Sequence, residues 1–236
     1  LDRPNPNGFY VDGPVLKEGN ESFVGMHKVP IVHGMTIGEY AKMINGEGWL
    51  NGKTKAPLTV VTCGNYEHKD FYKLPVRPSP NLPNMASIYL YPSLCLFEGT
   101  QVSVGRGTEK PFQLFGSPKI HKTEFSFTPK PMPGAKRPKL NGELCHGFDL
   151  EDFGMEYMRN YGKLYLYWIV AVYDEYTDKE TFFREDGFFR LLSGDRKIRK
   201  MIEEGKTAEE IWQSFQPEIE EFKNIRSKYL LYKDFE

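Results

Sequence analysis

The chain has 236 residues, of which 31 are basic and 32 acidic, so its net charge is −1. This length suits one large domain or two small ones. The charge balance argues against an extended nucleic-acid interface, which needs a basic surface. Cys63, Cys95 and Cys145 show no paired spacing, so we expect neither a metal site nor a disulfide framework.

The sequence predicts no cofactor and no membrane span. The string Gly105-Arg-Gly-Thr108 lacks the spacing of a phosphate-binding loop, and the longest apolar run, 164–173, is too short to cross a bilayer. No signal peptide is recognisable. The abrupt opening, Leu1-Asp-Arg-Pro-Asn-Pro6, is typical of a loop that leaves a strand, so we expect a fragment or a processed chain.

The first half is predicted to combine loops, short strands and one helix. Thr36 and Glu39 form a capping box, in which each side chain bonds the backbone amide of the other residue. The helix that follows carries an apolar stripe formed by Ile37, Tyr40, Ala41 and Ile44. The β-branched run 58–63 predicts a buried strand, and residues 84–130 are expected to be mainly β.

The second half is predicted to be mostly helical. Residues 162–176 have apolar residues at helical spacing and indicate a largely buried helix. A further helix, 191–204, is expected to stop at Gly205. Thr207 and Glu210 form a second capping box, and the helix after it is expected to break at Pro217.

The segment from Tyr91 to Thr108 carries the densest polar chemistry. Its polar side chains alternate with apolar ones: Glu98, Thr100, Ser103, Arg106 and Thr108. Glu98 follows an apolar run, so partial desolvation suits it to general-acid duty; an ion pair with Arg106 is an equally good alternative. Arg106 lies between two glycines that let a ligand approach, and its planar fork suits a carboxylate.

Three further residues are candidates, each with a structural alternative. His33 precedes the capped helix, where free amides favour an anion or a sugar oxygen, and the alternative is a hydrogen-bonded turn. Asn81 lies on a rigid proline-rich loop and could bind sugar hydroxyls or form an Asx turn. Glu47 lies at a helix end that disfavours a carboxylate, which indicates either a ligand or a tertiary partner.

Taken together, the motifs resemble the NamZ-type exo-β-N-acetylmuramidases, a bacterial family. The resemblance rests on many spaced strings across the chain: Leu1-Asp-Arg-Pro-Asn-Pro6, Gly13-Pro14, Ser22-Phe-Val-Gly25, His33-Gly-Met-Thr-Ile-Gly-Glu39, Asn45-Gly-Glu47, Pro78-Ser-Pro-Asn81, Tyr91-Pro92, Glu98-Gly-Thr100, Ser103, Gly105-Arg-Gly-Thr108, Pro111-Phe112, Cys145 to Asp149, and Arg226 to Tyr232.

The resemblance implies an α/β fold in two parts. Residues 1–64 would be the C-terminal portion of a Rossmann-like catalytic domain, and residues 65–236 an α+β auxiliary domain, with the active site in the cleft between them. Family members carry a further N-terminal segment with a Glu-His-Gly motif, whose Glu is the favoured catalytic candidate. We therefore expect that segment to be missing here and to act as a partner of this chain.

The resemblance also implies a function. It points to a glycoside hydrolase that releases N-acetylmuramic acid from the non-reducing end of peptidoglycan fragments, in cell-wall turnover and recycling, and to a periplasmic or secreted location. The alternatives are a non-catalytic module that binds muropeptides or amino sugars and, with less support, a structural interaction domain. Glu98 would be the catalytic carboxylate, with Glu47 second.

The remaining candidates would bind the substrate. Arg106 would hold the lactyl carboxylate of N-acetylmuramic acid. Hydroxyl and acetamido groups would be bound by Asn81, Thr100 and Ser103, with His33, Asn5 and Thr108 completing the site. The expected ligand is thus a peptidoglycan-derived saccharide.

Overall fold

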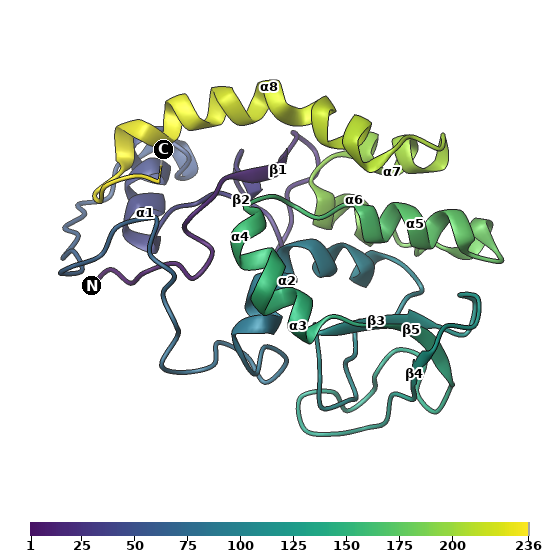
Figure 1. Cartoon of the computed structure of the whole chain (residues 1–236). Helices are drawn as coiled ribbons and strands as arrows, with labels where there is room; N and C mark the ends of the chain where they lie inside the picture. Colours follow the sequence, from purple (N-terminus) through teal and green to yellow (C-terminus); the bar gives the residue numbers. More distant parts are fainter. Residues whose placement is uncertain (236) are drawn as a thin grey trace.

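The computed structural model describes residues 1–235 and shows mixed helix and sheet (Figure 1). The strands are β1 (Asp12–Val15), β2 (Pro30–Val32), β3 (Leu114–Ser117), β4 (Phe125–Phe127) and β5 (Cys145–Asp149). The α-helices are α1 (Ile37–Gly46), α2 (Met85–Leu94), α3 (Glu151–Phe153), α4 (Arg159–Tyr161), α5 (Tyr167–Glu175), α6 (Phe188–Ser193), α7 (Arg196–Glu203) and α8 (Ala208–Arg226). A π-helix, η3 (Gly154–Met158), joins α3 to α4, and the 3-10 helices are η1 (Asn51–Lys53), η2 (Cys95–Gly99), η4 (Lys179–Thr181) and η5 (Ser227–Tyr229).

The strands form two small sheets. β1 pairs antiparallel with β2, and the second sheet has the antiparallel order β3-β5-β4. This mixture of helix and sheet confirms the coarse fold class. The finer description, the end of a Rossmann-like domain over 1–64 followed by an auxiliary domain over 65–236, stays a prediction. Within the described part of the chain, no helix is long and apolar enough to cross a membrane.

Helix α1 begins as predicted but buries a different face. Thr36 and Glu39 form the expected capping box, and the Thr36 hydroxyl accepts the Glu39 amide. The buried residues of the helix, however, are Gly38, Glu39 and Met43, while Ile37 is 69% exposed. The predicted apolar stripe is therefore wrong, because a buried carboxylate network, rather than an apolar surface, covers the start of this helix.

The prediction of β structure for residues 84–130 is wrong at its beginning. Met85–Leu94 is helix α2, capped by the Asn84 side chain, which accepts the Ser87 amide at 3.0 Å. Pro92 lies inside its last turn, and almost every residue of the helix is buried. A helix that is buried all round lacks the alternation of apolar and polar faces that marks a surface helix.

The C-terminal helices differ from prediction at two breaks. The predicted helix 191–204 is two helices, α6 and α7, separated at Gly194, whose φ of 69° is left-handed. Helix α8 has the predicted capping box at Thr207 and Glu210, but it runs through Pro217 without stopping. The predicted break at this proline is thus wrong.

The run 58–63 is not a strand. It has no regular secondary structure and is mostly exposed. Its one bond to another described backbone group is from the Asp2 amide to the Val61 carbonyl oxygen, at 2.9 Å, and the Cys63 amide donates to the Tyr232 hydroxyl at 2.9 Å. A strand needs a neighbouring strand to satisfy its backbone groups. Its β-branched composition favours a strand, but among residues 1–235 no strand pairs with it.

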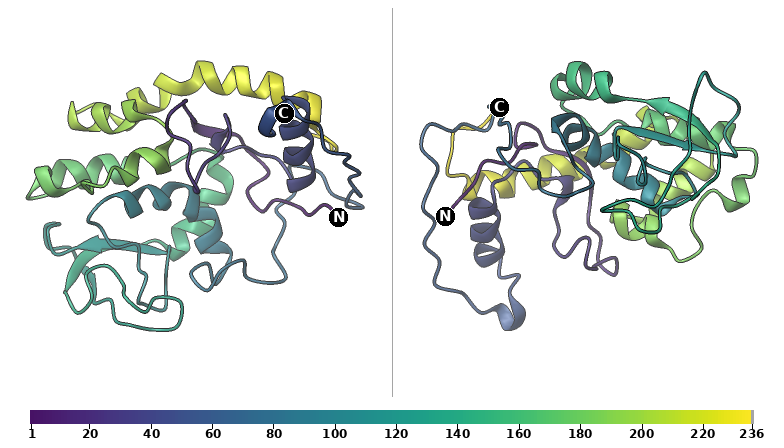
Figure 2. Two further views of the ribbon diagram at one scale, coloured as in Figure 1. Left: turned by 180° about the vertical axis from the view of Figure 1, so that it is seen from behind. Right: turned by 90° about the horizontal axis from the view of Figure 1, so that it is seen from below.

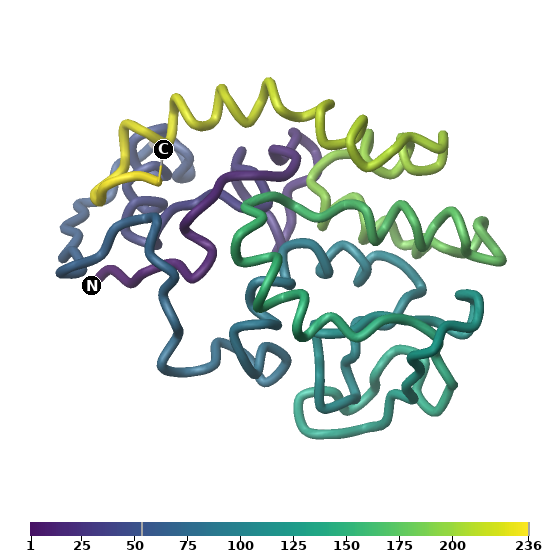
Figure 3. The backbone as a smooth tube through the Cα atoms, in the orientation of Figure 1, coloured from purple at the N-terminus to yellow at the C-terminus, as the bar shows by residue number. Residues whose placement is uncertain are grey.

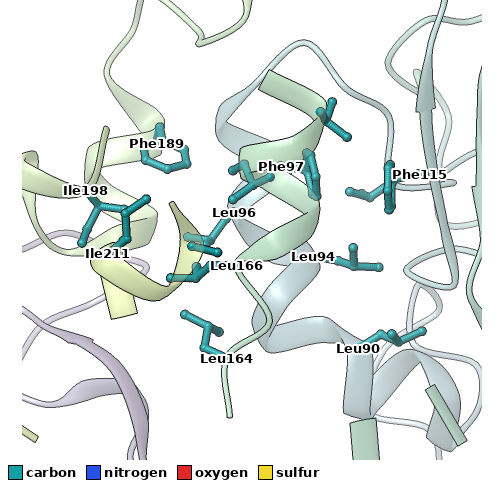
Figure 4. Packing of buried hydrophobic residues seen from close by; sticks show 14 of the residues in the cluster. Leu90, Leu94, Leu96, Phe97, Phe115, Leu164, Leu166, Phe189, Ile198 and Ile211 are labelled. Carbon is teal, nitrogen blue, oxygen red and sulfur yellow. The ribbon is translucent and has the colours of Figure 1, made fainter. Parts of the chain in front are cut away.

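The core lies where α2 and η2 meet the later helices. Figure 4 shows Leu94 and Phe97 beside Phe115 of β3, with Phe189 and Ile211 approaching from α6 and α8. Helix α8 extends along one side of the molecule in Figure 1 and in the left view of Figure 2. Its end and the segment after it return to α1, so the two ends of the chain lie near each other (Figure 3).

Candidate functional site

Glu98 is positioned by a tightly packed turn. It belongs to η2, whose neighbours Leu96 and Phe97 are buried in the core, while its own side chain is 23% exposed. The adjacent Gly99 packs directly on α6, and a Cβ at Gly99 would lie 2.4 Å from the Cα of Phe189. The backbone of the turn therefore has little freedom, so the point from which the Glu98 side chain extends is fixed.

Arg106 forms an ion pair with Glu98. Its Nη2 lies 2.9 Å from Oε1 of Glu98, so the alternative that the sequence left open is present. The guanidinium also lies 5.4 Å from the centroid of the Phe112 ring. Its Nε is buried and has no hydrogen-bond partner among the described residues. Arg106 thus has donors left for a second anion.

A small cationic recess of about 90 Å³ lies beside this pair. It is lined by Glu98, Val102, Ser103, Val104, Arg106, Lys139, Arg184 and Phe188. The sequence analysis missed Lys139 and Arg184, because they follow the end of the segment at Thr108 by 31 residues or more and belong to no motif. Because three cationic side chains surround one carboxylate, this recess is suited to binding an anion.

Lys139 is fixed in the recess by backbone carbonyl groups. Its ammonium donates to the carbonyl oxygens of Thr100, of Val102 at 3.1 Å and of Phe97 at 3.4 Å. Burial, and next the nearby charge of Arg184, lower the pKa of Lys139 to about 8. The lysine therefore fastens the turn that carries Glu98 and adds positive charge behind it.

Glu98 also lines a larger cavity of about 320 Å³. Its polar lining includes His27, His33, Tyr40, Tyr91 and Glu98. Its apolar lining includes Leu16, Val29, Phe188, Leu191 and Leu192. Volumes of this order are usual for small-molecule sites, and a mixed lining suits a sugar, which has both polar edges and apolar faces.

His33 presents a neutral ring to this cavity. Its Nδ1 accepts the Met35 amide at 3.1 Å, so in the neutral ring the proton is on Nε2, which bonds to no described residue. Burial and then the charge of Arg226 lower the pKa of His33 to about 4, although Glu39 opposes them. The ring stacks on Tyr40, with centroids 5.0 Å apart, and His27 Nδ1 lies 2.8 Å from the Tyr40 hydroxyl.

Asn81 and Thr108 lie at a different cavity, also of about 320 Å³, which shares no lining residue with the two cavities at Glu98. The Asn81 amide donates to the Gly134 carbonyl oxygen at 3.2 Å. The Thr108 hydroxyl donates to the Gly105 carbonyl oxygen at 2.7 Å. The structure therefore does not bring these two predicted residues together with Glu98.

Three other predicted residues are accounted for by internal hydrogen bonds and line none of these cavities. The Thr100 hydroxyl is fully buried and donates to the Phe97 carbonyl oxygen at 2.8 Å. The Asn5 amide donates to the Met35 carbonyl oxygen at 2.9 Å. Glu47 accepts the Tyr229 hydroxyl at 2.6 Å, which is the tertiary partner that its unfavourable helix position indicated. Of the predicted set, the structure groups Glu98 with Arg106, Ser103 and His33.

Two family models cover nearly the whole chain. Residues 89–232 match the model described as exo-beta-N-acetylmuramidase NamZ, C-terminal, and residues 1–86 match its N-terminal counterpart. The chain belongs to the NamZ family. This confirms the family resemblance noted in the sequence. The two matches meet between residues 86 and 89; the predicted boundary after residue 64 stays a prediction.

Individual relatives agree with the NamZ assignment. The chain is 38% identical to the peptidoglycan beta-N-acetylmuramidase NamZ of Bacillus subtilis (strain 168), over 98% of this chain and 58% of that protein. It is 50% identical to a DUF1343 family protein of Bacteroides fragilis, whose crystal structure matches 99% of this chain and 65% of that one with a TM-score of 0.95. A second DUF1343 family structure from the same species shares the fold, with 24% identity, a TM-score of 0.79 and the same coverage. The chain spans 58% to 65% of the length of these proteins.

Proposed function

We propose that the chain forms the amino-sugar site of a glycosidase that releases N-acetylmuramic acid from the non-reducing end of peptidoglycan fragments, in cell-wall turnover and recycling. One observation carries the proposal. Glu98, paired with Arg106, lines both a cavity of about 320 Å³ and a cationic recess of about 90 Å³. The names of the matched family and of the Bacillus subtilis relative support it.

The two cavities fit the two parts of this sugar. N-acetylmuramic acid has a pyranose ring and a lactyl carboxylate. In the proposal the ring occupies the larger cavity, where the His33 Nε2–H donates to a ring substituent. The carboxylate faces the recess, where Arg106 offers the fork geometry that pairs well with carboxylates. Glu98 then lies between them, beside the glycosidic bond.

Hydrolysis of a glycosidic bond usually needs two carboxyl groups. Among the described residues that line the two cavities, Glu98 is the sole carboxylate. We therefore propose that the second group comes from a segment outside these residues, in keeping with the greater length of the relatives. The Rossmann-like character of the first part and a periplasmic or secreted location belong to the same proposal.

A non-catalytic binding module is the second candidate. The same observation favours it: a site with one carboxylate, already joined to a cation, can hold a sugar without cleaving it. In this alternative Glu98 and Arg106 only fix the ligand, and the chain delivers or retains muropeptides.

Turnover of a 4-nitrophenyl glycoside of N-acetylmuramic acid separates the two candidates. The glycosidase predicts steady release of nitrophenol that Glu98→Gln lowers at least about 100-fold, as expected when a general acid or nucleophile is removed. Saturable binding of free N-acetylmuramic acid without any release would instead establish the binding module.

A further inference from the structure

Glu98 is shared by two cavities. With Phe188, it is one of two residues that line both the larger cavity and the cationic recess. Its carboxylate currently points to Arg106, at 2.9 Å. In this position the carboxylate is engaged on the recess side and is not bonded to any described group in the larger cavity.

The three cations of the recess differ in how firmly they are held. Lys139 donates to three carbonyl groups, and Arg184 pairs with Asp186 and also donates to the Glu98 carbonyl oxygen at 3.4 Å. Arg106 has only the Glu98 carboxylate as an anionic partner among the described residues, and its buried Nε has none. Arg106 is therefore the cation that can change partners.

An acidic ligand would compete directly for Arg106. A ligand carboxylate in the recess would approach Glu98 as well as Arg106, and two carboxylates at one guanidinium repel each other. The existing pair is partly exposed, at 41% for Arg106 and 23% for Glu98, and such pairs contribute little to stability. Replacing the Glu98–Arg106 ion pair by a bidentate pair between Arg106 and the ligand therefore costs little free energy.

We propose that a ligand carboxylate displaces Glu98 from Arg106, and that the displaced Glu98 then turns to the sugar in the larger cavity. The inference rests on the proposed function and adds a regulatory step to it. The acid group of the sugar is not only recognised but also releases the carboxylate that acts on the glycosidic bond. The exchange replaces one carboxylate by another on the same guanidinium, so no uncompensated charge is left in the recess.

This mechanism has a kinetic signature. N-acetylglucosamine lacks the lactyl group, so its glycosides would enter the larger cavity and leave the ion pair intact. The two sugars should then differ mainly in kcat, because the released Glu98 is needed for the reaction and not for binding. A site that used Arg106 only to hold the lactyl group throughout the reaction would discriminate through KM instead.

The variant Arg106→Gln tests the exchange with 4-nitrophenyl glycosides of the two sugars. The glycoside of N-acetylmuramic acid should lose about 10- to 100-fold in kcat/KM, as expected for loss of a charged hydrogen-bonding partner. The glycoside of N-acetylglucosamine should gain in kcat, because Glu98 is no longer held. An equal loss for both sugars, or no gain for the neutral one, would overturn the inference while leaving the glycosidase intact.

Arg199→Gln is the matched control. Arg199 forms a similar ion pair with Glu203 on α7, at 2.7 Å and with 41% exposure, and lines neither cavity at Glu98. The variant Arg199→Gln should leave kcat and KM unchanged for both glycosides. Arg106→Lys keeps the charge and is a second variant if Arg106→Gln folds poorly: it should give an intermediate loss for the acidic sugar.

If the unaltered protein turns over neither glycoside, the proposed function fails. The proposed displacement of Glu98 from Arg106 then fails with it. Calorimetric titration with the two free sugars then shows what Arg106 does: binding of N-acetylmuramic acid that is lost in Arg106→Gln would leave Arg106 as a recognition residue alone.

Discussion

Arg226 donates from Nη2 to the carbonyl oxygen of Gly34 at 2.7 Å. Asp234 holds the same guanidinium through bonds of 2.6 and 2.9 Å, and the arginine side chain is 1% exposed. Gly34 directly follows His33 and has a φ of 60°, and a Cβ there would lie 2.7 Å from the Tyr10 carbonyl oxygen. The loop that presents His33 is thus fastened by the end of α8 and the segment after it.

Replacing Arg226 by alanine should destabilise the protein strongly. The change removes the partner of Asp234 and of the Gly34 carbonyl group, and breaking a buried ion pair costs about 3–5 kcal/mol. Because Asp234 is partly exposed, we expect the free energy of unfolding to fall by about 3 kcal/mol. Urea unfolding measures the loss. Arg199→Ala, which removes an exposed pair, should cost less than about 1 kcal/mol. Equal losses for the two variants would contradict the role given to Arg226.

The pH dependence of stability should report the neutral state of His33. Burial and Arg226 lower its pKa from 6.5 to about 4, so between these values the unfolded chain binds a proton that the folded chain does not. The stability that comes from keeping His33 neutral is therefore fully present above pH 6.5 and is lost as the pH falls through about 4. The loss reaches up to about 3 kcal/mol.

His33→Asn removes the titrating group and keeps an acceptor for the Met35 amide. Its unfolding free energy should fall less steeply than that of the unaltered protein when the pH is lowered from about 7 to about 4.5. Parallel pH profiles for the two proteins would show that His33 titrates normally.

Gly99→Ala should disturb both the fold and the site. Its Cβ would meet the backbone of Phe189 at 2.4 Å, where nothing flexible can yield, and overpacking of this kind costs about 1–3 kcal/mol. The shift should also displace Glu98 and lower turnover. Gly64→Ala, where no atom lies within 4 Å of the added Cβ, is the control and should be close to neutral in thermal unfolding.

Lys139→Met should loosen the turn that carries Glu98. The methionine keeps most of the apolar stem but leaves the Phe97, Thr100 and Val102 carbonyl groups without their charged donor. Hydrogen bonds to a charged group contribute about 1.5–3 kcal/mol, so we expect a loss of about 2 kcal/mol in denaturant unfolding. Lys200→Met, at a lysine that is 74% exposed, should have no such effect.

Helix starts were predictable because they depend on neighbours along the chain. The capping boxes at Thr36 and Thr207 are complete within a few residues, and both are present. Helix α2 was missed for the opposite reason. Its buried surroundings come from distant segments, and together with Pro92 they erase the pattern by which a helix is recognised from its sequence.

In the candidate site, too, the features that depend on nearby residues were predictable and those that depend on distant residues were not. The Glu98–Arg106 pair lies within one short segment, and the sequence offered it as one of two alternatives. Lys139, Arg184 and His27 reach the cavities from elsewhere in the fold, and no local pattern announces them. The internal bond of Thr100 is equally invisible in the sequence, because a hydroxyl looks the same whether it binds a ligand or the protein itself. For Glu47 the sequence left a ligand and a tertiary partner open, and only the fold identifies Tyr229 as the partner.

The contact between Arg226 and Gly34 joins residues 192 positions apart. A chain emerges from the ribosome with its N-terminal residues first, at about 5–20 residues per second. The loop that carries His33 therefore waits for many seconds of translation before the helix that fastens it has been made. During that time the nascent protein has a histidine loop without its anchor, and the loop is fastened only after residue 226 has been made.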